Sequence, residues 1–247
     1  MIGICNLSNI PLRHEPDSRS EMISQLLFGE TFEIIENTKD WTKVVTHFDT
    51  YSGWISSKQF EIPDTPIQSN VTAGVFPFLE AALQNSKIFI PPGANLPDLI
   101  KDNFRINKND YKLTAPNTLH TISGLASIAM QYLNVPYLWG GRTPSGIDCS
   151  GFTQTVFKQI GINLRRDAYQ QADSGETVNF IEEIKQGDLA FFDNEEDKII
   201  HVGILLDKRR IIHASGRVRI DEIDNFGILN PEINGYSHKL RIIKRMF

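Results

Sequence analysis

The feature that most constrains the fold of this chain is a change of sequence pattern near residue 115. Before this point, short runs of alternating apolar and polar residues are separated by turn-forming residues, a pattern typical of β-strands. After it, apolar residues recur at helical spacing in two segments, and several strand-like runs then follow one another. Helices followed by consecutive strands favour an antiparallel sheet. We therefore predict an α+β protein whose domains differ in architecture.

Residues 1–62 are predicted to form a small β-barrel. Strand-like runs cover residues 26–35, 41–45 and 53–55. Between and within them lie residues typical of turns, namely Gly29, Asn37, Asp40 and Gly53. Closely spaced short strands favour a barrel over a layered sheet. The succession of a glycine-bearing turn, a tryptophan-containing strand and a Gly-Trp strand resembles the bacterial SH3-like domain.

Residues 63–114 are interrupted by six prolines, which disfavours long regular elements. Within this stretch, residues 78–83 are predicted to form a short helix and residues 87–90 a strand. We interpret the segment as a connector packed on its neighbours, or as one that completes the barrel.

Residues 115–247 are predicted to begin with two helices. Apolar residues at helical spacing indicate a helix over residues 119–133, with Asn117 or Thr118 as its N-cap. A second helix is predicted over residues 149–160, and Gly161 ends it. Strands are predicted to follow at residues 188–192, 199–206, 210–214 and 239–244.

Composition narrows the class of protein. The formal net charge is -5 and the pI is about 5.7, so no nucleic-acid or acidic-membrane partner is indicated. No apolar run reaches the ~20 residues that span a bilayer, and the first residues lack the basic and apolar regions of a signal peptide. We therefore expect a cytoplasmic protein. The two cysteines, Cys5 and Cys149, are too few for a disulfide scaffold or a cysteine-rich zinc site.

Cys149 is the predicted nucleophile because of its place in the chain. It follows a turn-rich loop at residues 139–148 and starts the second predicted helix. At a helix N-terminus, unpaired N–H groups and the macrodipole favour a thiolate over a thiol. The small neighbours Ser150 and Gly151 allow a substrate backbone to approach. Cys5 lies in an apolar strand-like run and is predicted to be structural.

A nucleophilic cysteine needs a base and a group that orients the base. Among six histidines, His201 and His213 each lie inside an apolar strand-like run, on successive strands. We predict that His201 accepts the thiol proton and that His213 holds the His201 ring in place. A zinc site built from these two histidines is disfavoured because no acidic or cysteine ligand has suitable spacing, so no metal or cofactor is predicted. The other histidines are predicted to lie at the surface (His14, His47, His238) or to cap or pack at a helix start (His120).

Five sequence motifs strengthen this prediction. In order, they are PYLWGG at 136–141, DCSGF at 148–152, GDLAFF at 187–192, HVGI at 201–204 and IHASG at 212–216. Together they resemble the NlpC-type papain-like cysteine peptidases, which cut the stem peptides of peptidoglycan. The resemblance covers residues 116–247 and implies a papain-like domain with helices packed on an antiparallel sheet. It also implies that Cys149 is the nucleophile, His201 the base and His213 the third polar residue.

Combined with the SH3-like domain, this pattern is similar to the γ-D-glutamyl-L-diamino-acid endopeptidases of murein peptide recycling. That similarity implies a murein tri- or tetrapeptide substrate with a free N-terminal L-Ala, and an SH3-like domain that walls off the cleft. A buried ammonium group needs an anion and hydrogen-bond acceptors nearby. We predict Asp148 as that anion, with Tyr51 and Glu21 contributing from the first domain. The alternatives are ordinary barrel packing for Tyr51 and a solvated charge for Glu21.

A further segment is predicted to contact the substrate. Residues 166–171 match the family's Arg-Asp-x-x-x-Gln pattern, which implies that Asp167 and Ala168 line the cleft. Arg166 is predicted to pair with a substrate carboxylate or with the protein itself. Ala168 stands where the family often has serine, and Arg165 where it usually has proline.

The predicted reaction is covalent acyl transfer. Cys149 attacks the γ-carbonyl of D-Glu, and the oxyanion is held by the Cys149 backbone N–H together with the Tyr137 hydroxyl. His201 protonates the departing amine and then activates water. Ser150, beside the nucleophile, is a further predicted substrate contact.

Two alternatives share parts of this pattern. A secreted endopeptidase that acts on intact peptidoglycan would carry the same catalytic motifs, and the lack of a readable signal peptide disfavours it. A non-catalytic wall-binding protein would need only the SH3-like part, and the complete set of Cys149, His201 and His213 disfavours it. Both meso-diaminopimelate and Lys stay open at the third position of the peptide, and a monomer is the working expectation.

Overall fold

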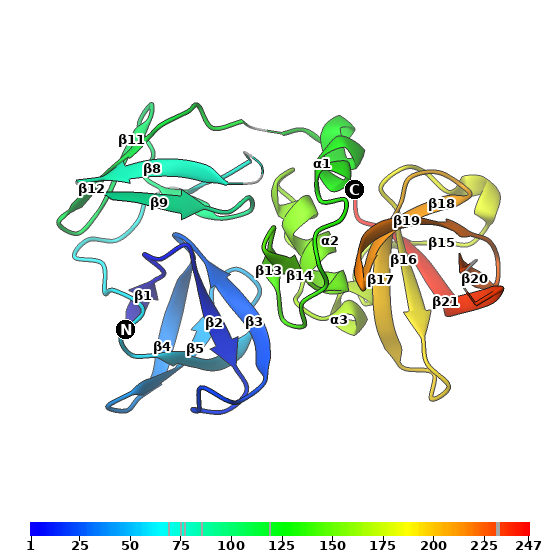
Figure 1. The fold of residues 1–247 in the computed structure, drawn as a ribbon, viewed down its shortest axis with the longest axis horizontal. Helices are drawn as coiled ribbons and strands as arrows, with labels where there is room; N and C mark the ends of the chain where they lie inside the picture. Colours follow the sequence, from blue (N-terminus) through cyan, green and yellow to red (C-terminus); the bar gives the residue numbers. More distant parts are fainter. Residues whose placement is uncertain (69, 75, 77, 85, 119, 231–232) are drawn as a thin grey trace.

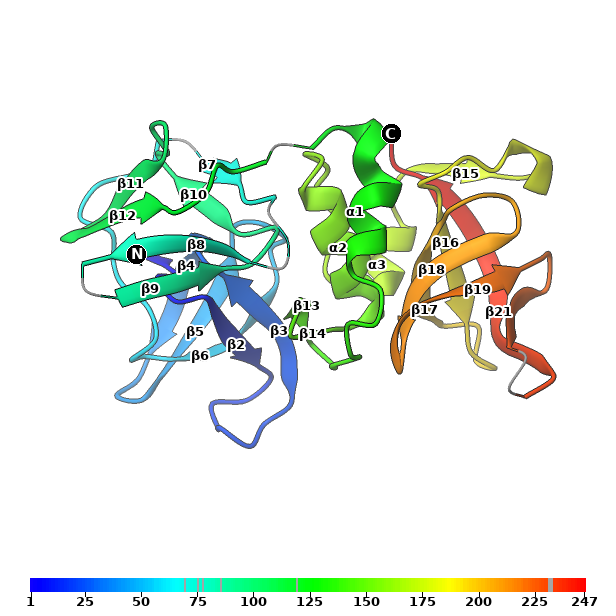
Figure 2. The same ribbon diagram turned by 45° about the horizontal axis from the view of Figure 1, so that its top comes forward.

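The computed structural model describes residues 1–68, 70–74, 76, 78–84, 86–118, 120–230 and 233–247. Strands from the N-terminal half lie on one side of the molecule, and a curved C-terminal sheet lies on the other (Figure 1). The helices stand between them, and a view turned by 45° shows the same arrangement (Figure 2). The predicted α+β class is confirmed.

Strands β1 to β6 form one antiparallel sheet in the order β1-β4-β5-β6-β2-β3. Their bounds are β1 Ile2–Ile4, β2 Asn9–Arg13, β3 Met22–Leu27, β4 Thr31–Asn37, β5 Trp41–Thr46 and β6 Ser52–Ser56. The sheet encloses a core made of Cys5, Ile10, Leu12, Leu26, Phe32, Val44 and Ile55. The predicted SH3-like fold is confirmed, and Cys5 is fully buried in this core.

Residues 63–114 do not complete the barrel but form small antiparallel sheets of their own. One sheet has the order β11-β12-β8-β9, and β10 pairs with β7. The bounds are β7 Asn70–Thr72, β8 Leu79–Leu83, β9 Ser86–Ile90, β10 Asn95–Pro97, β11 Asn103–Ile106 and β12 Asn109–Leu113. In their core, the rings of Phe104 and Tyr111 stack with centroids 4.9 Å apart.

The predicted helix over residues 78–83 is wrong. Leu79 and Ala81 are buried while Glu80 between them is partly exposed, a two-residue period that suits a strand. Strand β8 pairs with β9 on one side and with β12 on the other. These two ladders satisfy its backbone and outweigh the helix propensity of Leu, Glu and Ala. The predicted strand at residues 87–90 is confirmed within β9.

The helices follow after residue 120. Their bounds are α1 Leu125–Gln131, α2 Cys149–Lys158 and α3 Ala168–Ala172, with 3₁₀ turns η1 Ile122–Gly124 and η2 Ile181–Glu183. Helix α2 confirms the second predicted helix, and Gly161 beyond it has φ +84°, the left-handed conformation of a helix stop. In the part of the chain that the structure describes, no helix is long and apolar enough to cross a membrane.

The first helix begins later than predicted. Helical structure starts at Ile122, and Leu119 lies outside the described residues. Neither Asn117 nor Thr118 caps it. The Asn117 side chain instead accepts a hydrogen bond from the Gly74 N–H and donates one to a backbone carbonyl of β7. Asn117 therefore fastens the entry of the C-terminal domain to the preceding sheet.

The C-terminal sheet has the order β15-β21-β16-β17-β18-β19-β20, and β20 also pairs with β21. Strands β16 to β21 therefore close into a barrel. The bounds are β15 Glu176–Val178, β16 Leu189–Asp193, β17 Ile199–Leu205, β18 Arg210–Ser215, β19 Arg217–Ile223, β20 Gly227–Asn230 and β21 Gly235–Arg245, with the small hairpin β13 Arg142–Thr143 and β14 Gly146–Ile147 before them. The four predicted strands are confirmed as β16, β17, β18 and part of β21.

The strands of this barrel alternate between two cores. Phe191, Val202 and Ile212 pack against the helices. Phe192, Leu205 and other apolar residues fill the interior of the barrel. The predicted packing of helices on an antiparallel sheet is thus confirmed.

A buried ion cluster joins the SH3-like sheet to α2. Glu30 lies 2.9 Å from Arg142 and 2.7 Å from Lys158, and each of these side chains is at most 5% exposed. The Phe48 ring covers both cations, with Lys158 Nζ 4.1 Å from its centroid. The cluster fixes the SH3-like domain against the helix that begins with Cys149.

Candidate active site

Cys149 is the first residue of α2, and Asp148 caps that helix. Asp148 accepts hydrogen bonds from the Gly151 N–H at 2.7 Å and from the Gly140 N–H at 2.9 Å. Gly140 has φ +76°, and a Cβ there would lie 2.2 Å from the Met22 carbonyl oxygen. Glycine is therefore required where the loop before α2 approaches strand β3. The thiol is placed at the border between the two domains.

Burial decides the resting protonation state of Cys149. Burial raises the pKa of this thiol to about 12, and the charge of Asp148 raises it further. Hydrogen bonds from the backbone at Val202 and Ser150, and the charge of Arg166, offset only part of this rise. Desolvation therefore opposes the thiolate that the helix N-terminus is predicted to favour. A neighbouring base must take the proton as the sulfur attacks.

His201 and His213 lie side by side on β17 and β18. His201 Nε2 is 2.8 Å from His213 Nδ1. The Cys149 thiol lies at the backbone of Val202, the residue after His201. Gly203 is opposite His213 in the strand register, and a Cβ on it would lie 2.8 Å from the His213 Cβ. The glycine of the HVGI motif thus leaves room for the second ring, so the two predicted histidines pair next to the strand residue whose backbone the Cys149 thiol contacts.

Two further residues, Asp221 and His238, complete the cluster and were not identified from sequence patterns. Asp221 of β19 lies 2.9 Å from His213 Nε2. His238 of β21 is half-buried and stacks on His201, with ring centroids 4.1 Å apart and planes at 26°. Its predicted surface position is wrong because barrel closure brings β21 beside β16 and β20. Among the residues that the structure describes, no group of three or more His, Cys, Asp or Glu is arranged to hold a metal.

Burial keeps both stacked histidines neutral. Burial and the neighbouring His213 and His238 lower the pKa of His201 well below 6.5, and burial and His213 lower that of His238 to about 4. Of the remaining histidines, His14 and His47 are exposed. The His120 ring forms a hydrogen bond with the Gly74 carbonyl oxygen.

We expect the free energy of unfolding to decrease as the pH falls below about 6.5. An unfolded histidine binds a proton near pH 6.5, whereas folded His201 and His238 do not until lower pH, so protons favour the unfolded state. Urea unfolding should show a loss of more than about 1 kcal/mol between about pH 7 and pH 5. His238→Phe keeps the stacked ring and should flatten this slope. The exposed His14→Phe is the matched control, and an equal slope in all three proteins would contradict the expectation.

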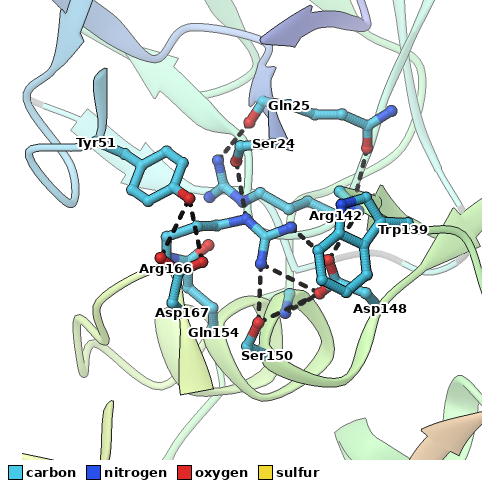
Figure 3. A network of polar contacts seen from close by, with 12 residues as sticks. Ser24, Gln25, Tyr51, Trp139, Arg142, Asp148, Ser150, Gln154, Arg166 and Asp167 are labelled. Carbon is cyan, nitrogen blue, oxygen red and sulfur yellow. Dashed lines mark hydrogen bonds and ion pairs between the residues drawn. The ribbon is translucent and has the colours of Figure 1, made fainter. Parts of the chain in front are cut away.

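A cleft of about 570 Å³ opens beside Cys149 and is lined by both domains. It contains every residue predicted to contact the substrate, namely Glu21, Tyr51, Tyr137, Asp148, Ser150, Arg166, Asp167 and Ala168. The SH3-like domain supplies its far wall, as Figure 3 shows for the side chains that cross the domain border.

Arg166 and Asp148 form a buried ion pair at 2.5 Å (Figure 3). Arg166 also donates to Ser150 Oγ and to Ser24 Oγ of β3, each at 2.9 Å. Of the two roles predicted for Arg166, the geometry therefore supports pairing with the protein. The charge of Asp148 is balanced within the protein by this pair.

Tyr51 and Asp167 meet across the domain border. The Tyr51 hydroxyl donates to the Asp167 carboxylate, with both oxygens 3.1 Å away (Figure 3). Burial, and then the charge of Asp167, raise the pKa of Tyr51, so this hydroxyl keeps its proton. Burial also raises the pKa of Asp167. Tyr51 therefore does more than pack in the barrel.

The rim of the cleft carries Trp139, which sequence patterns did not single out. Its Nε1 donates to Glu21 at 2.6 Å, so Glu21 is held at the cleft rather than left as an isolated solvated charge. Tyr137 lies inside the cleft, where burial and then the charge of Cys149 raise the pKa of its hydroxyl. A protonated hydroxyl near the sulfur is suited to donate to an oxyanion.

Comparison with known proteins places both domains in known families. Residues 134–231 match the NlpC/P60 family, and residues 12–60 match the bacterial dipeptidyl-peptidase Sh3 domain. Gamma-D-glutamyl-L-lysine dipeptidyl-peptidases of Bacillus cereus and Bacillus subtilis are 26% and 28% identical to the chain. The alignments cover 83% and 77% of this chain and 70% and 71% of those proteins.

A solved structure agrees on the fold. An NlpC/P60 family protein from Bacillus cereus superposes with a TM-score of 0.84 at 21% identity, over 99% of both chains. The family match, the peptidase relatives and the cysteine at the head of α2 together define the class of the protein. The chain therefore carries a cysteine peptidase domain of the NlpC/P60 family, preceded by a bacterial SH3 domain.

Proposed function

We propose that this peptidase hydrolyses the bond between γ-D-Glu and the diamino acid of murein peptides whose N-terminal L-Ala is free. The observation that carries the proposal is the pairing of Tyr51 with Asp167, which closes the cleft near Cys149 with an acidic group. We propose that a cleft bounded by this pair accepts a short peptide end and rejects a continuing glycan-linked chain. The names of the two Bacillus relatives support L-Lys as a third residue.

The proposed reaction proceeds through a thioester. His201 takes the thiol proton as Cys149 attacks the γ-carbonyl carbon of D-Glu, forming a tetrahedral oxyanion. The Cys149 backbone N–H and the Tyr137 hydroxyl stabilise that oxyanion. His201 then gives the proton to the diamino-acid nitrogen as the C–N bond breaks. In the second half, His201 takes a proton from the water that attacks the thioester, and returns it to the sulfur as the C–S bond breaks, which releases L-Ala-D-Glu and restores the thiol.

The substrate ammonium group is proposed to bind at Asp167. Asp148 already forms an ion pair with Arg166, whereas among the residues that the structure describes no cationic group forms an ion pair with Asp167. The Tyr51 hydroxyl orients it, and Glu21 adds a second negative charge at the rim. In this position, the carboxylates replace the water molecules that the ammonium group loses when it enters the cleft.

A free L-Ala amine arises only after the glycan has been removed, so the proposed role is recycling of murein peptides inside the cell. The test uses L-Ala-γ-D-Glu-L-Lys, its meso-diaminopimelate counterpart and the N-acetylated form of each, with products identified by mass. We expect release of L-Ala-D-Glu from the free peptides and at least about 100-fold lower kcat/KM for the acetylated ones. Equal cleavage, or cleavage of intact sacculi, would instead support a secreted wall endopeptidase.

Tyr51→Phe is expected to raise KM by about 10-fold with little change in kcat. The substitution keeps the ring in the barrel and removes the hydroxyl that orients Asp167. Tyr236→Phe is the matched control, because the Tyr236 hydroxyl donates to Asp224 at the exposed surface. Steady-state kinetics of the two variants on the free tripeptide check the prediction. Identical KM values in both would remove Tyr51 from amine recognition.

A further inference from the structure

Three neighbouring strands of the barrel carry a continuous hydrogen-bonded chain of side chains. His201 on β17 contacts His213 on β18 at 2.8 Å, and His213 contacts Asp221 on β19 at 2.9 Å. The strands are adjacent in the sheet (Figure 2). The chain therefore runs from His201, the neighbour of the Val202 backbone that the Cys149 thiol contacts, to a carboxylate outside the family motifs.

Asp221 is held in its ionised form. Its carboxylate is nearly buried, and Arg219 donates to it from Nη2 at 2.9 Å and lies 2.8 Å away through Nε. Burial alone would raise the pKa of Asp221, but hydrogen bonds from His213 and Arg219 and the charge of Arg219 lower it overall. An ionised carboxylate only accepts hydrogen bonds.

This acceptor determines where the protons lie on both rings. Because Asp221 accepts, His213 Nε2 must carry a proton, and in the neutral ring its Nδ1 is then an acceptor. His201 Nε2 must therefore donate to His213 Nδ1, which leaves Nδ1 of His201 with a lone pair. That nitrogen is the one available to take the thiol proton.

We propose that Asp221 is a positioning residue for the peptidase reaction: through His213 it fixes the tautomer of His201 and stabilises the imidazolium formed when Cys149 is deprotonated. The inference rests on the proposed roles of Cys149 and His201. Besides Asp221, Arg219 and the Cys149 thiol, His238 faces the ring pair: it stacks on His201, and its ring centroid lies 5.7 Å from that of His213. His238 is neutral near pH 7 and supplies no competing charge.

The central variant is Asp221→Asn, which keeps the size of the side chain and loses its charge. An amide can donate to His213 Nε2, which places protons on His213 Nδ1 and then on His201 Nδ1, the nitrogen that must act as base. We expect kcat to fall by at least about 100-fold while KM changes less than about threefold. Asp221→Glu restores the carboxylate and should recover activity to within about 10-fold of wild type.

Asp224→Asn is the matched control. Asp224 directly follows β19 and accepts hydrogen bonds from Tyr236 and from the Phe226 N–H at the exposed surface. Its loss of charge should leave kcat unchanged. If Asp221→Glu loses as much activity as Asp221→Asn, the role assigned to the carboxylate is wrong.

A second readout needs no substrate and separates this inference from the proposed function. The rate at which iodoacetamide alkylates Cys149 is measured against pH by peptide mass, with Cys149→Ala as the blank. Wild type should react near neutrality with the help of His201, whereas Asp221→Asn should react at least about 10-fold more slowly there and gain rate only in alkaline solution.

The possible results test the positioning role of Asp221 and the proposed reaction of Cys149 separately. A wild-type alkylation profile and a wild-type kcat in folded Asp221→Asn would overturn the inference and leave the nucleophile assignment intact. Activity that survives in Cys149→Ala would overturn the proposed reaction itself. An altered alkylation profile together with cleavage of a different bond would retain Asp221 as a positioning residue and reject only the proposed substrate.

Discussion

Replacing Cys149 with alanine is expected to lower kcat by at least about 10⁴-fold, because no other group in the cleft can form the thioester. The alanine fits without strain at the first position of α2, so the fold and substrate binding should persist. Circular dichroism and the Kd for an uncleaved N-terminal peptide check that the loss is chemical. Turnover above about 1% of wild type would contradict the assignment.

The chain supplies its own control in the other cysteine. Cys5 is fully buried in the SH3-like core, and burial strongly raises its pKa, so it is unsuited to react. Cys5→Ala should cost about 1 kcal/mol of stability and leave kcat at the wild-type level. A thiol alkylator should inactivate the wild type and Cys5→Ala alike.

Replacing Glu30 with alanine is expected to lower the free energy of unfolding by about 3–5 kcal/mol. The substitution leaves Arg142 and Lys158 buried at the domain interface without the carboxylate that pairs with both. Glu80→Ala is the matched control, since Glu80 pairs with Lys87 at the exposed surface and should cost less than about 1 kcal/mol. Urea unfolding of both variants measures the difference.

Glu30 also makes the free energy of unfolding depend on pH. Burial raises the pKa of Glu30, but Arg142 and Lys158 outweigh it and lower the value from 4.5 to about 2. Glu30 therefore stabilises the fold fully above about pH 4.5, and this contribution disappears as the pH falls toward 2. Equal unfolding free energies for Glu30→Ala and Glu80→Ala near neutral pH would show that the interface does not depend on the ion cluster.

Much of the fold could be predicted because its signals are local. Strands β4, β5, β17 and β18 alternate or concentrate apolar residues within a few positions, and α2 shows a clear helical period. Residues 78–83 could not be assigned correctly, because Leu, Glu and Ala favour a helix until two neighbouring strands pair with them. Closure of the C-terminal barrel depends on the pairing of β20 with β21, which no short window of sequence reveals.

The residues of the site also fall into two groups: those that short sequence motifs indicate, and those that only the fold brings into the site. Cys149, His201 and His213 lie in short motifs whose residue types suggest their chemistry. Asp221 and His238 lie in polar stretches that resemble solvated strand surfaces, and only strand register brings them to the histidine pair. The protonation state of Cys149 was beyond sequence patterns because it depends on burial by residues distant in the chain.

We propose that Cys149 carries the L-Ala-γ-D-Glu acyl group during turnover. Rapid acid quenching of the enzyme with L-Ala-γ-D-Glu-L-Lys, followed by mass spectrometry of the peptide that contains Cys149, tests this directly. We predict an adduct with the mass of the L-alanyl-γ-D-glutamyl group on Cys149, and none with the N-acetylated peptide or in Cys149→Ala. An adduct that retains the diamino acid, or full turnover with Cys149 never modified, would contradict the account.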